Sequence, residues 1–172
     1  MDTLDRIWVT LVAEFSDLSE VEQITRASLR LTLAVVLGGV VGYERESQGK
    51  AAGLRTHMLV TLGAALFVMA IHEGGAQADA VSRVIQGIAA GIGFLCAGTI
   101  LKGSQVSEVK GLTTAAGLWL STAIGISVGL GHSATAVLGT LLALLVLHVL
   151  PRWLERNRPP AEQAAREERD VP

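Results

Sequence analysis

Residues 134–150, ATAVLGTLLALLVLHVL, contain no Asp, Glu, Lys or Arg. A helix on the surface of a soluble protein would carry a polar stripe along one side, and this run has almost none. Its length is close to the roughly 20 residues that cross a hydrocarbon core of about 30 Å. The run therefore predicts a membrane-spanning helix rather than a helix of a soluble bundle.

Four further apolar segments precede it. They lie at residues 28–43, 57–71, 84–101 and 112–130. The first two are short for a span, so their flanking side chains must reach the water boundary or the helices must stand nearly upright. The sequence predicts an all-α, polytopic membrane protein with a bundle of five transmembrane helices.

The amino-acid composition excludes several classes of protein. Half of the 172 residues are apolar, 17% are charged and there is one cysteine. These values exclude a disordered chain and a disulfide scaffold. The formal net charge of −2 provides no basic field for a polyanion, so we expect a lipid bilayer and no nucleic acid as partner.

The chain divides into three parts. In residues 1–27, Leu4, Ile7, Trp8 and Leu11 recur at helical spacing, which predicts an amphipathic helix lying on the membrane surface. Residues 28–150 form the five-helix domain. Residues 151–172 are rich in Arg, Glu, Ala and Pro and are expected to be a charged, disordered tail.

Positive charge predicts the orientation. Of the 14 Lys and Arg residues, ten lie in the first connection, the third connection and the C-terminal tail. Loops rich in Lys and Arg stay on the cytoplasmic side. We therefore expect the N-terminus outside and the C-terminus in the cytoplasm, which an odd number of spans allows.

Glycines recur at helix-contact spacing within the spans. In lipid, small residues four apart let two helix backbones approach closely. Three pairs have this spacing, and they are Gly38 with Gly42, Gly87 with Gly91, and Gly125 with Gly129. Gly93 and Gly98 are two further glycines in the third span. We interpret them as packing positions rather than as a conducting path. The same faces could form a homo-oligomer, with a dimer favoured.

Ionisable residues lie at the helix ends, and none of Asp, Glu, Lys or Arg occupies the middle of a span. Groups at the predicted cytoplasmic end are Glu44, Arg45, Arg55, Thr56, Lys110, Thr113 and Thr114. Helix starts bind anions and carboxylates, so Glu44 could dock there as an internal ion pair, and Thr56 could cap the second span. At the outer end, Asp79 and Arg83 have the spacing of an i,i+4 pair.

Metal ligands and catalytic groups are scarce. Mg²⁺ takes oxygen ligands, typically one or two carboxylates with several waters, and Asp79 and Glu44 are the best candidates. Cys96 is a lone thiol that we interpret as a small packing residue. No phosphate-binding loop and no nucleophile with a base at readable spacing occur. We expect no enzyme activity and no cofactor, with Mg²⁺ as the one ion to consider.

Four blocks together closely resemble the MgtC/SapB family of bacterial inner-membrane proteins. The blocks are GGVVGYERE (38–46), KAAGLRTHMLVTLGAALF (50–67), SRVIQGIAAGIGFLCAGTILK (82–102) and VKGLTTAAGLWLSTAIGISVGLG (109–131). The resemblance covers about residues 30–150 and implies five spans with the N-terminus outside. It also points to Gly53, Leu54, Gly111, Ala115 and Trp119.

The resemblance implies a role in adaptation to low magnesium. The family often has Gly where Cys96 stands, which implies a looser or differently tuned helix contact there. Many relatives also carry a soluble C-terminal domain that this sequence does not show, which makes it a short form.

Two hypotheses for function follow. The first is a regulatory or interaction protein of magnesium homeostasis that contacts another membrane complex through its helices. The second is a transporter or channel for Mg²⁺ or another small ion. The sequence favours the first, because an ion without a central carboxylate would have to pass largely hydrated.

Overall fold

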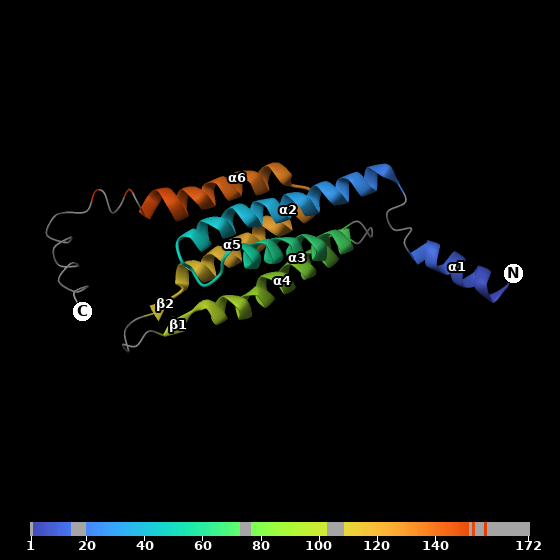
Figure 1. Ribbon diagram of the computed structural model, residues 1–172, viewed down its shortest axis with the longest axis horizontal. Helices are drawn as coiled ribbons and strands as arrows, with labels where there is room; N and C mark the ends of the chain where they lie inside the picture. The colour runs from blue at the N-terminus through green and yellow to red at the C-terminus, as the bar shows by residue number, and fades with distance from the viewer. Residues whose placement is uncertain are drawn as a thin grey trace.

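The computed structural model describes residues 2–14, 20–72, 77–102, 109–151, 153 and 157. Within these ranges the chain is mainly helical (Figure 1). The elements are α1 (Thr3–Glu14), α2 (Val21–Ser47), α3 (Leu54–His72), α4 (Ala78–Thr99), α5 (Leu112–Gly129), α6 (Ser133–Leu144) and the π-helix η2 (Leu145–Val149). The predicted all-α class is confirmed.

The helices reproduce the five apolar segments. By length and composition α2, α3, α4 and α5 could each cross a membrane, and Ser133–Val149 is a shorter apolar helix. The first of them starts earlier than the apolar segment alone suggested, because α2 begins at Val21 and runs through 27 residues. The predicted fold class, a polytopic bundle of apolar helices, is confirmed.

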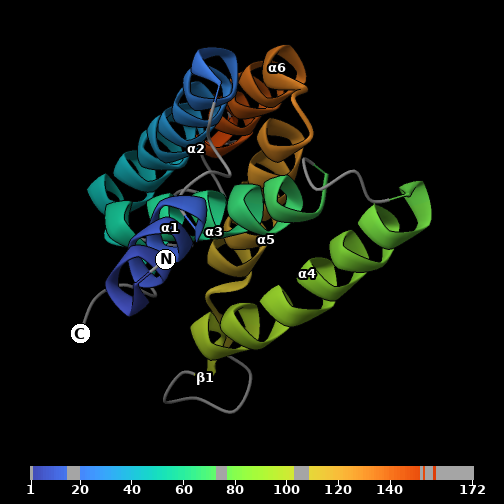
Figure 2. The same ribbon diagram turned by 90° about the vertical axis from the view of Figure 1, so that its right-hand side faces the viewer.

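α5 lies at the centre of the packing, in contact with α2, α3, α4 and α6. Figure 2 shows α2 and α6 side by side on one flank and α4 on the other. The buried apolar core is shared by α2, α3, α5 and α6, with Val41, Ala65, Ile124 and Val128 among its members. α4 contributes only Val81 and Ile92 as buried residues, so it is attached to the bundle mainly along one side.

Glycines make the contacts around α3 close. A Cβ added at Gly42 would lie 2.7 Å from the Cα of Leu54, and one added at Gly129 would lie 2.8 Å from the carbonyl oxygen of Ala65. Added Cβ atoms at Gly38 and Gly125 would likewise collide with atoms of Thr61. The glycine pairs of α2 and α5 therefore lie directly against α3, as expected for helices that associate through small residues.

A short antiparallel pairing joins α4 to α5. β1 (Leu101–Lys102) pairs with β2 (Val109–Lys110), and Gly111 follows with a φ of 94°. Only glycine adopts this backbone conformation readily. An added Cβ would also strike the carbonyl of Thr99, so Gly111 allows α5 to start directly beside the end of α4.

α1 is not packed into the bundle. None of the residues of α1 is buried, and Leu4 and Trp8 are 74% and 68% exposed. Its predicted place on the membrane surface stays a prediction. Of the predicted disordered tail, only Pro151, Trp153 and Asn157 fall within the described residues.

Candidate functional site

The last turns of α2 bury two charged side chains. Glu44 is 7% exposed and Arg45 is 3% exposed. The Arg45 guanidinium donates a hydrogen bond from Nε to Glu44 Oε2, and its Nη2 forms an ion pair with the same oxygen. Because removing either partner would leave an uncompensated buried charge, the two side chains must be treated as one unit.

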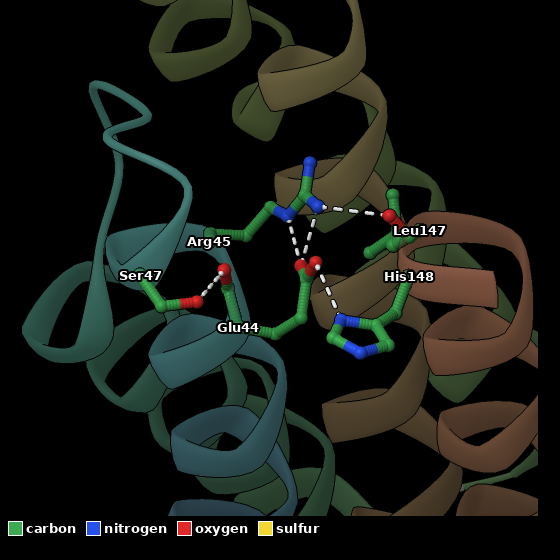
Figure 3. A network of polar contacts seen from close by, with 5 residues as sticks. All are labelled: Glu44, Arg45, Ser47, Leu147 and His148. Carbon is green, nitrogen blue, oxygen red and sulfur yellow. Dashed lines mark hydrogen bonds and ion pairs between the residues drawn. The ribbon is translucent and has the colours of Figure 1, made fainter. Parts of the chain in front are cut away.

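The π-helix η2 also contacts Glu44 and Arg45. Arg45 Nη2 donates a hydrogen bond to the Leu147 carbonyl at 3.3 Å, and His148 Nδ1 lies 3.7 Å from Glu44 Oε1 (Figure 3). A π-turn breaks the regular i→i+4 bonding of a helix and is often found at functional sites. Here it lies where α6 meets the end of α2, and one of its carbonyls accepts from Arg45.

A second polar pair lies next to the first. His57 on α3 is fully buried, and its Nδ1 lies 2.7 Å from the Ser121 hydroxyl on α5. Gly117 lies between the two pairs. A Cβ added there would be 3.6 Å from His57 Cε1 and 4.0 Å from Arg45 Cδ. Polar groups from α2, α3 and α5 therefore meet in the bundle interior, and His148 of η2, whose side chain is 42% exposed, lies at their edge. We call Glu44, Arg45, His57 and Ser121, with His148 at the edge, the buried polar cluster.

Not every polar atom of the buried polar cluster has a hydrogen-bond partner among the described residues. Among the described residues, Glu44 Oε1, His57 Nε2 and His148 Nδ1 are buried without a hydrogen-bond partner. A buried polar atom without a partner costs on the order of 1–3 kcal/mol. A proton, a water molecule or an ion that binds at these atoms would remove this cost.

The residues predicted at the cytoplasmic end separate into buried and exposed groups. Glu44, Arg45 and Thr114 are buried, whereas Arg55, Lys110 and Thr113 are exposed and Thr56 is half-buried. Glu44 does form an internal ion pair, but its described partners come from α2 and η2 and not from the two helix starts.

The start of α3 is bound by a different carboxylate. Glu46 Oε2 accepts a hydrogen bond from the Leu54 N–H at 2.8 Å. A carboxylate was expected at this helix start, but Glu46 takes the place foreseen for Glu44. Thr56 lies inside the first turn, because α3 already begins at Leu54.

The candidate metal ligands lie at opposite ends of the bundle. Asp79 is in the first turn of α4 and exposed, whereas Glu44 lies near the end of α2. α3 connects these two ends with 19 residues, which corresponds to about 28 Å at 1.5 Å per residue. The two carboxylates therefore cannot share one ion. In the described part of the chain, no group of three or more His, Cys, Asp or Glu side chains is placed to hold a metal.

Arg83 is exposed like Asp79, and no ion pair joins the two within the residues that the structure describes. The i,i+4 spacing on α4 is present, but the expected pair is not formed.

α4 differs from α2 and α5 in how its glycines are placed. Gly87, Gly91, Gly93 and Gly98 have no atom within 4 Å of an added Cβ, their own helix backbone aside. Cys96 donates a hydrogen bond to the Ala115 carbonyl of α5 at 3.2 Å, so the thiol lies in the helix contact where family members often have glycine. Trp119, one turn further along α5, is 55% exposed.

A groove of about 740 Å³ runs between α3 and α4. Arg55 and Thr56 line one end, and apolar side chains line most of the remainder. Gly87 and Gly91 form part of its wall, so these two glycines face an open space rather than a neighbouring helix within the chain.

The sequence carries only weak signals for three of these residues. His57 stands at the start of an apolar segment, as an interfacial residue would, although it is among the most deeply buried side chains. Ser121 is one of several hydroxyl-bearing residues in the apolar segments. His148 is the only ionisable side chain in the apolar run 134–150, and that isolation is the signal that identifies it.

Comparison with known proteins places the chain in a family. The family model described as "MgtC family" matches residues 31–156. The chain is 42% identical over 146 residues to Protein SrpB of Synechococcus elongatus, which covers 76% of this chain and 80% of SrpB. No solved structure matches.

Two further relatives are longer than the part that this chain matches. The chain is 40% identical to "Putative magnesium transporter YhiD" of Escherichia coli K12 over 70% of this chain and 59% of YhiD. It is 38% identical to Protein MgtC of Salmonella paratyphi A over 80% of this chain and 58% of MgtC. The chain thus spans less than two thirds of these two curated relatives.

Proposed function

Because the chain belongs to the MgtC family, we propose that it is a bacterial inner-membrane protein of magnesium homeostasis that binds another membrane protein through the exposed face of α4. The name of one relative, the putative magnesium transporter YhiD, supports the link to magnesium. Since this chain covers only part of the longer relatives, the proposal concerns the region that they share with it. We further propose that the N-terminus faces outward and the C-terminus faces the cytoplasm, as the charge distribution predicts.

The contrast between the glycines of α4 and those of α2 and α5 carries this proposal. Glycine in a helix costs about 1 kcal/mol relative to alanine, and in lipid the usual compensation is a close contact with another helix. Gly42 and Gly125 have such a contact with α3, whereas Gly93 and Gly98 have open space around them. A helix from another protein would supply the missing contact.

A large exposed aromatic side chain supports the same face. Phe94 lies one turn before Gly98 and is 85% exposed. Buried aromatic anchors carry a large share of the energy in protein interfaces. Small residues beside an aromatic side chain would give a partner helix both a close approach and an anchor.

Leucine substitutions on α4 test the proposal. We expect Gly93→Leu and Gly98→Leu to abolish growth at low Mg²⁺ in a strain that depends on this protein, with its amount in the membrane unchanged. Gly139→Leu on α6 is the matched control, because Gly139 also has no atom within 4 Å of an added Cβ. Equal growth of all three variants would contradict a role for the α4 face.

A second candidate function is transport of Mg²⁺ or another small ion. It is favoured by the buried Glu44 carboxylate, whose Oε1 lacks a hydrogen bond among the described residues. Uptake of Mg²⁺ into liposomes that contain only the purified protein, lost in Glu44→Gln and Asp79→Asn, would establish transport and defeat the interaction proposal. Neither candidate function is catalytic.

A further inference from the structure

The groove between α3 and α4 is a space that the chain leaves open. Gly63 on α3 and Gly87 and Gly91 on α4 line it, and none has an atom of a neighbouring element within 4 Å of an added Cβ. The groove is mostly apolar, with Leu59 and Phe67 among its lining residues. Because α3 and α4 are both apolar enough to cross a membrane, their groove would be surrounded by lipid tails.

One end of the groove carries a positive charge. Arg55 and Thr56 line it at the start of α3, and the Arg55 side chain is exposed. The nearest acidic side chain in the preceding segment, Glu46, accepts a hydrogen bond from the Leu54 N–H. The polar residue further in, Thr122, donates its hydroxyl to the Leu118 carbonyl at 2.9 Å, so it does not offer a free donor to a ligand.

The length of the groove matches one leaflet. Arg55 and Phe67 are twelve positions apart on α3, which corresponds to about 18 Å at 1.5 Å per residue. Half of a hydrocarbon core of about 30 Å is roughly 15 Å. A chain that starts at Arg55 and follows the groove would therefore end near the middle of the bilayer.

The volume of the groove is that of a small-ligand site. The groove holds about 740 Å³, within the range of about 300–1,000 Å³ for sites of small ligands. An extended hydrocarbon chain is narrow enough to lie in a site of this size.

We propose that this groove binds one acyl chain of an anionic phospholipid, with the phosphate of its headgroup beside Arg55. Lipid headgroups of this kind bind basic residues between transmembrane helices on the cytoplasmic side, which is the predicted side of Arg55. The proposal does not depend on the partner protein proposed above, because it concerns the purified chain in lipid.

Photo-cross-linking tests the position of the acyl chain. The probe is phosphatidylglycerol with a photoreactive group near the end of one acyl chain, in vesicles of phosphatidylcholine that contain the full chain. We expect cross-links at Phe67 and Val84, which line the groove. The double variant Gly87→Leu/Gly91→Leu fills the groove and should lose them, whereas the control Gly139→Leu should keep them.

Native mass spectrometry tests the charge. From vesicles with equal phosphatidylglycerol and phosphatidylcholine, the wild-type protein should retain the anionic lipid in about fivefold excess, the ratio expected for one Arg near an anionic surface. Arg55→Gln should lose this preference and Arg55→Lys should keep it. Arg83→Gln is the matched control, because Arg83 is an exposed arginine that does not line the groove.

Three results would overturn the proposal. They are the absence of cross-links at Phe67 and Val84 in the wild-type protein, cross-links that persist in the filled-groove variant, and equal retention of both lipids by the wild-type protein. Since no partner protein is present in either experiment, these results leave the proposed function untouched.

Discussion

Replacing Gly42 by alanine tests how closely α2 and α3 approach. The added Cβ would lie 2.7 Å from Leu54 Cα, 2.9 Å from the Leu54 carbonyl oxygen and 3.0 Å from the Gly53 carbonyl oxygen. Carbon atoms prefer separations of about 3.5–4.0 Å, so the two helices would have to separate by about 1 Å. All three atoms belong to the backbone of Leu54, the first residue of α3, and of Gly53 just before it, so no side-chain rotation can relieve the overlap.

Two opposing contributions determine how much Gly42→Ala changes the free energy of unfolding. Overpacking in a well-packed interior costs about 1–3 kcal/mol, and we take the upper value of about 3 kcal/mol because the backbone must move. Removing a glycine from a helix interior returns about 1 kcal/mol. Gly42→Ala should therefore lower the free energy of unfolding by about 2 kcal/mol.

Gly139→Ala is the matched control. Gly139 has no atom within 4 Å of an added Cβ, so only the gain in helix propensity of about 1 kcal/mol remains. The two variants should differ by about 3 kcal/mol, which is roughly a hundredfold in the ratio of folded to unfolded protein. Steric trapping in bicelles measures this free energy, and a Gly42→Ala protein as stable as Gly139→Ala would refute the close contact.

Two further predictions concern the buried polar cluster, and a third concerns the orientation in the membrane. Glu44→Gln should lower the free energy of unfolding by about 3–5 kcal/mol, because it leaves the Arg45 charge buried without its partner. Ser121→Ala should cost about 1–3 kcal/mol, because His57 Nδ1 loses its hydrogen bond in the bundle interior. Both are measured by unfolding in bicelles. A cysteine introduced at the exposed Lys50 in a Cys96→Ala background should react with an impermeant thiol reagent only after the cells are opened.

Each of these predictions has a control within the chain. The variant with both Glu44→Met and Arg45→Met should lose less stability than the two single losses added together. Ser127→Ala removes a hydrogen bond to the Ala123 carbonyl of its own helix, so it should cost less than Ser121→Ala. Gln77→Cys should react in intact cells, and labelling of Lys50→Cys under the same conditions would reverse the orientation.

The number and kind of the helices followed from the sequence. Apolar runs of nearly 20 residues with charges only at their ends have few stable arrangements other than helices across a membrane, because lipid cannot satisfy exposed backbone groups. α2 starts at Val21, ahead of the apolar segment 28–43, and its first turns carry the polar side chains of Glu22, Gln23, Thr25 and Arg26. The side of the membrane on which each end lies stays a prediction from the charges.

The sequence alone identified the glycine pairs but not the different environments of their members. Gly38, Gly42, Gly125 and Gly129 contact α3, whereas Gly87 and Gly91 have the same spacing and line an open groove. Spacing places residues on one face of a helix, but it does not say which helix that face meets.

The buried polar cluster depends on contacts far apart in the chain. Sequence placed Glu44 beside Arg45, but the π-helix that brings Leu147 and His148 to them lies about a hundred residues later. The pairing of His57 with Ser121 likewise joins two separate spans. Apolar pattern and charge determine that segments enter the membrane and where they end, because these are properties of each segment by itself. Which polar groups meet inside depends on how the helices rotate and cross, and only their mutual packing decides that.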